Sequence, residues 1–152
     1  LKQHRARLLA ITRLLRKYAQ EPHLSPLFEL LLSVPGVGFV FSMALITEIM
    51  DMARFKSFDH LASFVGLVPS ISSTDDKYTK KAMTKRQNRY LRHLIVEAAW
   101  VGRRKDPVLL AKYDDLCKTM KSQEAIIRIA KKLLSRIRCV WLNREPYVIG
   151  VD

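Results

Sequence analysis

The stretch Ser33-Val34-Pro35-Gly36-Val37-Gly38-Phe39 stands between two apolar segments and decides the fold of the chain. Apolar residues recur at helical spacing before it, over residues 27–34, and after it, over residues 40–50. Pro35 predicts the end of the first helix, because the residue before a proline is displaced from the α region. Gly36 and Gly38 permit the positive φ angles that tight turns use. The stretch therefore predicts two helices that meet at a turn, within residues 25–50.

The second helix of this pair starts beside Gly36 and Gly38, which expose their backbone N–H groups. The first N–H groups of a helix have no partner within it, and the positive end of the helix dipole attracts anions. A phosphate could bind here, as in a helix-hairpin-helix, a module that grips the nucleic-acid backbone without reading bases. An ordinary tight turn between packed helices fits the same residues, so both interpretations stay open.

The composition points to a polyanionic partner. The chain has 152 residues, 49% of them hydrophobic, which is enough for the core of one domain. Its 27 Lys and Arg against 14 Asp and Glu give a net charge of +13. Nucleic acid is the first candidate partner, and an anionic membrane surface is the second. No apolar run approaches the roughly 18 residues that span a bilayer, and no signal peptide precedes the domain, so we expect a cytoplasmic protein. Of the two candidate partners we favour nucleic acid and expect no membrane partner, with a peripheral membrane protein as an alternative.

Cysteine and histidine are too dispersed to predict a metal site. Cys117 and Cys139 are isolated and fit reduced, half-buried thiols rather than a disulfide framework. No histidine forms a ligand pair with a cysteine, so we predict no structural zinc and no metal-binding residues. Glu48, Asp51 and Asp59 are expected to be surface charges.

The N-terminal segment predicts a separate amphipathic or coiled-coil helix. One heptad position holds Leu1, Leu8 and Leu15, and the other holds His4, Ile11 and Tyr18. This repeat favours self-association in the full-length protein. The chain begins at Leu1, inside this predicted helix, so we expect it to be part of a longer protein.

Capping residues mark the remaining helices. Ser57 predicts the start of a helix over residues 58–65, which Gly66 closes. Asp106-Pro107 opens another helix, and Ser122 is expected to cap the last one. The last helix has an apolar stripe (Ala125, Ile126, Ile129, Ala130, Leu133, Leu134, Ile137, Val140 and Trp141) and an outer face of cations (Arg128, Lys131, Lys132, Arg136 and Arg138). The predicted fold is all-α, with six or seven helices and at most a small β-hairpin near residues 66–83.

The strongest charge run lies in the middle of the chain. Between Lys77 and Lys105 there are ten Lys and Arg and a single acid, Glu97. Thr84 to Gln87 resembles a capping box, which predicts a helix that begins at Lys85. The run favours a phosphate-binding surface over a merely solvated face. Its candidate contacts are Lys77, Lys80, Lys81, Lys85, Arg86, Arg89 and Arg92, beside the hairpin glycines.

A cluster of hydroxyl groups precedes this basic run. Residues 70–74 contain three other hydroxyl side chains before Thr74, and no regular period fits them, which predicts an exposed loop or hairpin. A serine or threonine can attack a phosphodiester if its proton is removed and cations stabilise the transferring phosphoryl group. On the residues alone, a loop that contacts phosphate is favoured over a nucleophile.

Several motifs in this order resemble one family. They are Ser33 to Gly38, Arg54-Phe55, Leu61 to Ser70, Thr84 to Asn88 and Leu91-Arg92, followed by residues 125–134 and Pro146-Tyr147. Together they are similar to the C-terminal domain of bacterial insertion-sequence transposases that pair it with a Holliday-junction-resolvase-like N-terminal domain. The resemblance covers about residues 25–148, and residues 1–20 would then be the end of a helical linker between the two domains.

This resemblance implies a serine nucleophile, a DNA partner and a bridge RNA as guide. It also implies that a divalent metal, Mg²⁺, is bound by the N-terminal domain, with no cofactor in this chain. The family's nucleophile generally falls five residues after the proline, which here is Thr74, with Ser73 directly before it. Asp75, Asp76 and Gln87 depart from the family's usual small residues. We favour Ser73 over Thr74, and whether this copy is active stays open.

The sequence as a whole predicts a DNA transposase or recombinase fragment. The hairpin and the basic helix would hold the DNA backbone, and Ser73 or Thr74 would form a covalent protein–DNA intermediate. Two other classes stay open: a non-catalytic helix-hairpin-helix module that binds structured DNA or RNA, and a peripheral membrane or scaffold protein that uses the basic first helix.

Overall fold

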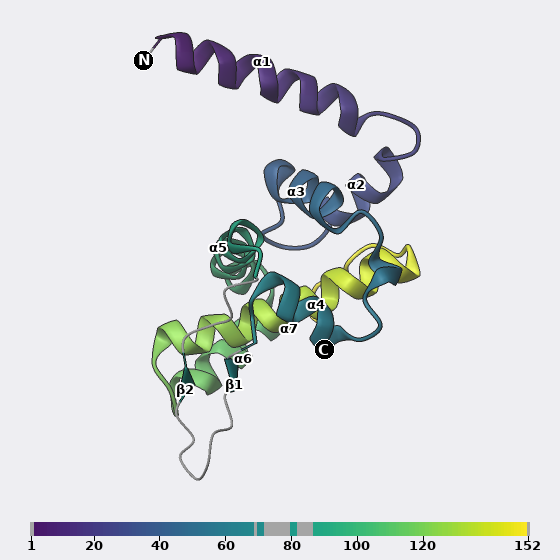
Figure 1. The fold of residues 1–152 in the computed structure, drawn as a ribbon. Helices are drawn as coiled ribbons and strands as arrows, with labels where there is room; N and C mark the ends of the chain where they lie inside the picture. The colour runs from purple at the N-terminus through teal and green to yellow at the C-terminus, as the bar shows by residue number, and fades with distance from the viewer. Residues whose placement is uncertain (1, 69, 72–79, 82–86, 152) are drawn as a thin grey trace.

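The structure, a computed structural model, describes residues 2–68, 70–71, 80–81 and 87–151. In these residues it contains seven α-helices, one turn of 3₁₀-helix and two short strands (Figure 1). Their bounds are α1 Lys2–Ala19, α2 Ser25–Leu32, α3 Phe39–Ile49, η1 Met52–Arg54, α4 Phe58–Val65, β1 Ser70–Ile71, β2 Lys80–Lys81, α5 Arg89–Lys105, α6 Pro107–Cys117 and α7 Ser122–Asn143. The prediction of an all-α fold with at most a small hairpin is confirmed.

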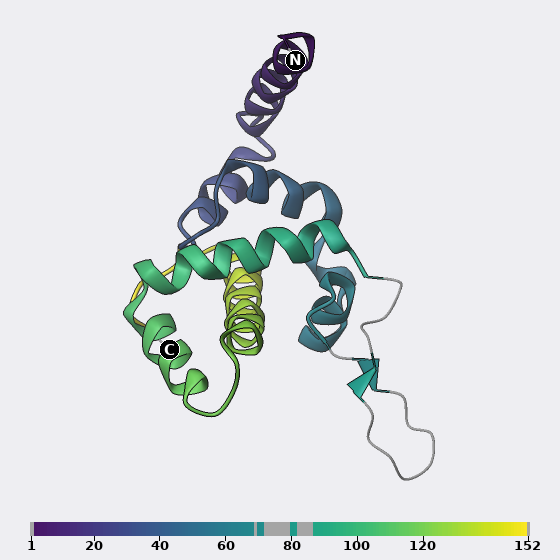
Figure 2. The ribbon, with the colours of Figure 1, turned by 90° about the vertical axis from the view of Figure 1, so that its left-hand side faces the viewer.

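The core is built around α7, the longest helix. All nine residues of its predicted apolar stripe are buried, from Ala125 to Trp141. Contacts join α7 to α2, α4, α5, α6 and η1. In Figure 2, α7 is seen end-on beneath α5, with α4 and α6 on opposite sides of it. The helical period of the sequence thus places one continuous apolar surface at the centre of the molecule.

Three of the predicted helix caps are confirmed and one is wrong. The Ser57 hydroxyl accepts the His60 N–H at 3.3 Å, and Gly66 ends α4 with a φ of +83°. Asp106 caps α6 through the Val108 N–H, at 2.9 Å. Ser122, in contrast, is the first residue of α7 rather than its cap, because its hydroxyl lies 2.6 Å from the Tyr113 hydroxyl and joins α6 to α7.

The first helix extends away from the rest of the chain (Figures 1 and 2). Its heptad side chains lie largely in solvent: Leu8 is 65% exposed and Ile11 is 55% exposed, while Leu15 packs partly against the core. The predicted helix is confirmed. Its role as a linker between domains stays a prediction.

No helix among the described residues is long and apolar enough to cross a membrane.

Candidate nucleic-acid interface

The turn between α2 and α3 packs directly onto the backbone of α5. Gly36 has a φ of +89°, as the sequence predicts, and a Cβ atom at this position would lie 2.1 Å from the Ala98 carbonyl oxygen. Gly102 makes the reciprocal approach, because its Cβ would lie 2.8 Å from the Pro35 carbonyl oxygen. Gly36 therefore permits a close contact between the turn and α5, and it is not an open phosphate contact by itself.

Gly38 does not use the positive φ that a glycine permits. Its φ of −111° and ψ of −178° are those of extended backbone. It stands at the N-cap of α3, is exposed, and has no atom within 4 Å of where its Cβ would be. The N-terminus of α3 is thus open at the surface, which is the geometry that an anion requires.

A shallow pocket of about 310 Å³ lies at this helix N-terminus. Its lining includes both hairpin glycines, Lys105 from the last turn of α5, and Ile149 from the C-terminal tail. Lys105 places a cation beside the unpaired N–H groups of α3. Lys105 cannot be recognised as a site residue from the sequence, because only the packing of α5 on the hairpin brings the two together.

The start of α5 lies later in the chain than predicted. The expected cap at Thr84 falls outside the described residues, and the helix begins at Arg89, with Asn88 as its cap. The Asn88 side chain accepts the Leu91 N–H at 3.0 Å and donates to Glu48 Oε2 at 2.6 Å, while its backbone N–H donates to the Phe64 carbonyl at 2.9 Å. The hydrogen bonds to Glu48 and Phe64 fix Asn88 in place and so explain why α5 begins directly after it. Arg89 is exposed and Arg92 is half-buried on the helix that follows.

The hydroxyl-rich stretch and the basic stretch meet at one backbone ladder. Ser70 pairs with Lys81 and Ile71 pairs with Lys80, in antiparallel register. Five of the predicted site residues lie outside the described residues: Ser73, Thr74, Lys77, Lys85 and Arg86. The roles assigned to them remain predictions.

An aromatic pair holds Arg54 near the start of α5. The Arg54 guanidinium lies 4.8 Å from the centre of the Phe55 ring and 4.9 Å from that of the Phe64 ring. Stacking occupies the faces of a guanidinium, whereas its N–H groups point outward in its plane and suit a phosphate. Phe64 also supplies the carbonyl that Asn88 binds. Arg54 is therefore a further exposed cation with a fixed position, which the sequence showed only as part of the Arg54-Phe55 motif.

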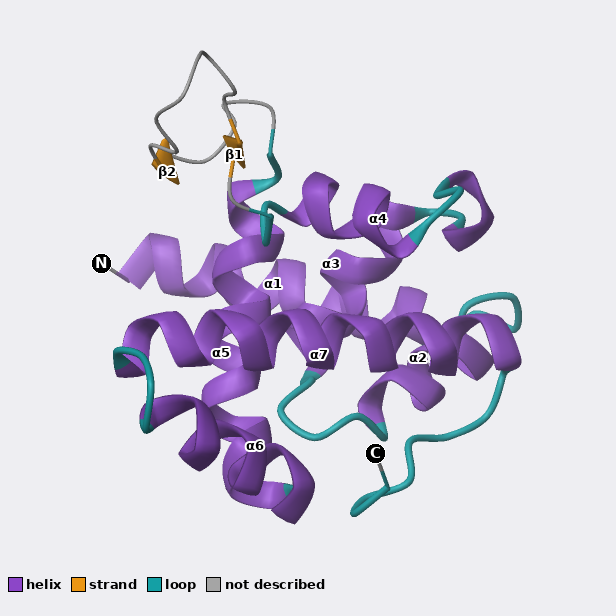
Figure 3. Ribbon diagram, turned by 90° about the horizontal axis from the view of Figure 1, so that it is seen from below, coloured by secondary structure: helices purple, strands orange, loops and turns teal. Residues whose placement is uncertain are grey.

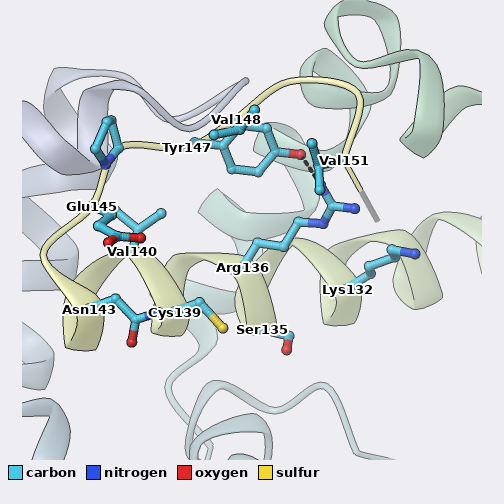
Figure 4. A pocket seen from close by; sticks show the side chains of 11 residues that line it. Lys132, Ser135, Arg136, Cys139, Val140, Asn143, Glu145, Tyr147, Val148 and Val151 are labelled. Atoms are coloured by element: carbon cyan, nitrogen blue, oxygen red, sulfur yellow. Dashed lines mark hydrogen bonds between the residues drawn. The ribbon is translucent and has the colours of Figure 1, made fainter.

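A partly buried cluster fixes the C-terminal tail to the core; Figure 4 shows two of its members, Tyr147 and Arg136, joined by a hydrogen bond. The Tyr147 hydroxyl donates to Asp106 Oδ2, and Arg136 Nη1 donates to the Tyr147 hydroxyl at 2.5 Å. Arg136 Nη1 lies 3.6 Å from Asp106 Oδ2, and the Tyr147 backbone N–H donates to the Ser33 hydroxyl at 2.8 Å. The cluster thus ties α6, α7 and the tail to the hairpin. Arg136, which the sequence places on the outer face, has a side chain only 14% exposed.

This cluster predicts a stability difference at alkaline pH. Burial, helped by the hydrogen bond to Asp106, raises the pKa of the Tyr147 phenol from 10.0 to about 12, against the opposing charge of Arg136. Because the pKa is higher in the folded state, the protonated phenol contributes its full stabilisation below pH 10 and loses it as the pH rises toward 12. We expect the stability advantage of the wild type over Tyr147→Phe to shrink across this interval, in urea unfolding at each pH. Tyr90→Phe, at an exposed site on α5, is the control, and an advantage that does not change with pH would contradict the assignment.

The pocket drawn in Figure 4 lies between α7 and the tail and has a volume of about 390 Å³. Lys132 and Arg136 line it, together with Tyr147 and Cys139. Arg136 is bound to the Asp106 cluster, so we assign this pocket to the attachment of the tail.

Both cysteines are free, as predicted, but they are exposed rather than half-buried, because Cys139 faces away from the apolar stripe and Cys117 ends α6. The described residues contain no group of three His, Cys, Asp or Glu side chains that could hold a metal ion.

The amino-acid sequence of this chain is similar to those of several proteins encoded by insertion sequences. It is 30% identical over 111 residues to a 43.6 kDa protein of insertion element IS110 from Streptomyces coelicolor, a match that covers 72% of this chain and 27% of that protein. It is 33% identical over 67 residues to the transposase of insertion sequence IS1111A from Coxiella burnetii, covering 44% and 18% of the two chains. It is 35% identical over 71 residues to the transposase of IS1328 from Yersinia enterocolitica, covering 47% and 21%. These relatives come from insertion sequences, and two are named as transposases.

A family model makes the assignment specific. Residues 28–114, more than half of the chain, match the model of the transposase IS116/IS110/IS902 family. The chain belongs to this family. It spans only 18% to 27% of the length of the three relatives described above.

Proposed function

We propose that this chain is the DNA-binding and strand-transfer part of a transposase, and that it contributes a hydroxyl nucleophile for cleavage of DNA. The observation that carries the proposal is the extent of the family match. Residues 28–114 include the hairpin, the hydroxyl-rich stretch and the basic start of α5. The three features that sequence analysis assigned to phosphate binding and chemistry therefore lie within one family segment.

In the proposed interface, the α2–α3 hairpin acts as a helix-hairpin-helix. A DNA phosphate would bind at the open N-terminus of α3, near Gly38 and Lys105, while Gly36 holds the turn against α5. Further phosphates would be bound by Lys77, Lys80, Lys81, Lys85, Arg86, Arg89 and Arg92. The net charge of +13 supports a long contact with a polyanion.

In the proposed reaction, the hydroxyl of Ser73 attacks a DNA phosphate, with Thr74 as the other candidate. The hydroxyl oxygen forms a bond to phosphorus, one phosphorus–oxygen bond to a deoxyribose breaks, and the serine proton passes to the deoxyribose oxygen that leaves. The product is a covalent protein–DNA ester, and no external reagent is consumed. Lys77, Lys85 and Arg86 would stabilise the charge that develops on the phosphoryl oxygens.

The remaining partners in the proposal come from the resemblance to the family. A divalent ion such as Mg²⁺ would polarise the phosphate and would be held by the acidic N-terminal domain, which lies outside this chain. The described residues bring no set of metal ligands together, so no step here is assigned to a metal. A bridge RNA as guide, a homo-oligomeric full-length protein and action on cytoplasmic, nucleoid DNA complete the proposal.

The test is the capture of the covalent intermediate. The full-length protein, with its guide RNA and a labelled DNA junction, is run on a denaturing gel, and the adduct is mapped by peptide mass. We expect an adduct at Ser73 that falls by about a hundredfold or more in Ser73→Ala but persists in Ser63→Ala, a matched change at an exposed position of α4. An adduct at Thr74 would move the nucleophile by one residue. If no adduct forms while salt-sensitive DNA binding persists, the non-catalytic helix-hairpin-helix alternative is correct.

A further inference from the structure

A second concave surface, distinct from the hairpin, crosses α7 on the side where α4 and α6 flank it. Its volume is about 920 Å³, and its walls come from α4, α5, α6, α7 and the residue Leu67. We call this surface the α7 groove. Figure 3 shows α7 between α6 on one side and, on the other, α4 with the segment that leads to β1. This size is within the range of sites that enclose small organic groups, and it exceeds the needs of a bound ion.

The floor of the α7 groove is apolar. Leu67 is 3% exposed, and Phe58, Leu116 and Ile127 are partly buried side chains packed against the core. A floor of this kind stabilises a flat apolar group that leaves water, such as the face of a nucleic-acid base. A phosphate alone is charged and would gain no binding free energy from contact with this apolar floor.

The rim of the same groove is cationic. Among the described residues that line it, Glu124 is the one carboxylate and five are cations: Arg92, Lys112, Arg128, Lys131 and Lys132. Lys131 is ordered by Asp59, at 3.3 Å, and lies 5.6 Å from the centre of the Phe58 ring. Lys112 and Arg128, from facing helices, are exposed. The groove therefore combines an apolar floor with a rim that attracts anions.

Arg92 connects this groove to the basic start of α5. Its side chain is half-buried, and burial lowers the pKa of its guanidinium. A cation that has lost part of its hydration gains more from an anionic partner than a fully hydrated one does. An anion next to Arg92 would thus compensate for the hydration that its guanidinium loses by burial.

We propose that the α7 groove binds single-stranded DNA, with an unpaired base on the apolar floor and the flanking phosphates on the cationic rim. The inference rests on the proposed function and deepens it. Bases in a duplex are stacked and paired, so a duplex would reach the rim cations and leave the floor in water, whereas an unpaired strand fills both. Leu67 and Arg92 also flank, in sequence, the segment that contains Ser73 and Thr74.

The test compares single-stranded and duplex binding in this 152-residue chain. Fluorescence anisotropy is measured with a labelled oligothymidine and with a duplex of the same length, in about 0.1 M salt. We expect Lys112→Ala with Arg128→Ala to weaken single-strand binding about tenfold and duplex binding about twofold or less. Arg5→Ala with Arg13→Ala removes the same charge from α1 and serves as the matched control. We expect it to leave the ratio of the two affinities unchanged.

A second variant tests the contribution of the apolar floor separately from that of the cations. Ile127→Ala keeps every charge, and we expect it to weaken the single strand about threefold or more without affecting the duplex. Oligothymidine that contains 4-thiothymidine should crosslink to peptides of α4, α6 or α7. Crosslinks confined to other elements, or equal losses for both DNA forms in the groove variants, would overturn the inference.

Two competitors complete the test. An oligouridine, or an acidic peptide, that occupied the groove at least about tenfold more tightly than oligothymidine would overturn the assignment to DNA. If the groove variants bound single-stranded DNA as tightly as the wild type, while duplex binding and the Ser73 adduct persisted, only this inference would be refuted. Absence of all DNA binding would refute the proposed function as well.

Discussion

Replacement of Gly36 by alanine is expected to destabilise the chain by about 3–5 kcal/mol, which is a large part of the stability of a typical domain. The new Cβ would lie 2.1 Å from the Ala98 carbonyl oxygen, 2.9 Å from the Ala98 carbonyl carbon and 3.0 Å from the Gly102 nitrogen. These atoms belong to the backbone of α5 and cannot rotate away as a side chain would. The φ of +89° adds strain, because a residue with a Cβ disfavours that region. Either the hairpin must separate from α5 or α5 must bend.

The matched control is Gly38→Ala, two residues further along the same turn. Gly38 has a negative φ, and its Cβ would meet no atom within 4 Å, so we expect a change of no more than about 0.5 kcal/mol. Urea unfolding followed by circular dichroism measures both variants. Equal stabilities for the two variants would show that the turn does not pack on α5 as described. Because Gly38→Ala preserves the fold, it also allows a separate measurement of DNA binding at the N-terminus of α3.

The sequence was sufficient to predict elements that depend on local pattern. The α7 stripe was found residue by residue, because helical periodicity over a long segment leaves little ambiguity. Ser57 and Asp106 were recognised as caps because they bind N–H groups two or three residues away, so their role is local. The hairpin was also recognised from Pro35 and Gly36.

The wrong predictions share a cause, which is competition from tertiary contacts. The Ser122 hydroxyl binds Tyr113 instead of capping its own helix. Asn88, rather than Thr84, starts α5, because Glu48 and the Phe64 carbonyl hold it in place. Arg136 was assigned to the outer face by its spacing, but the returning tail covers that part of α7. None of these partners can be identified from spacing along one element.

The candidate site was only partly predictable for the same reason. The basic run and the hydroxyl cluster are contiguous in sequence and were found there. Lys105 at the hairpin and the cations of the α7 groove come from separate helices, so only the fold shows that they converge. Arg54 stands out only once Phe55 and Phe64 are seen to hold it.

Replacement of Asp106 by alanine is the second change with a large expected effect, a loss of about 3–5 kcal/mol of stability. The Asp106 residue is 1% exposed, and its two carboxylate oxygens have separate roles. Oδ1 accepts the Val108 N–H and so caps α6, whereas Oδ2 accepts the Tyr147 hydroxyl and faces Arg136. The variant removes the cap and takes the carboxylate away from a guanidinium whose side chain is 14% exposed. The lost α6 cap, the lost hydrogen bond from Tyr147 and the lost carboxylate beside Arg136 together account for the expected loss.

Two comparisons separate these contributions. Asp106→Asn keeps an oxygen that can cap α6 and removes only the charge. We therefore expect it to be less stable than the wild type and more stable than Asp106→Ala. Asp115→Ala removes a carboxylate of α6 that binds Lys118 in solvent, and we expect no measurable change in urea unfolding. The tail also contacts the hairpin through Tyr147 and Ser33, so Asp106→Ala should weaken DNA binding at the N-terminus of α3 more than Asp106→Asn does. If Asp106→Ala proved as stable as Asp115→Ala, the cluster would not hold the tail, and the hairpin would be supported by its contacts with α5 and α7 instead.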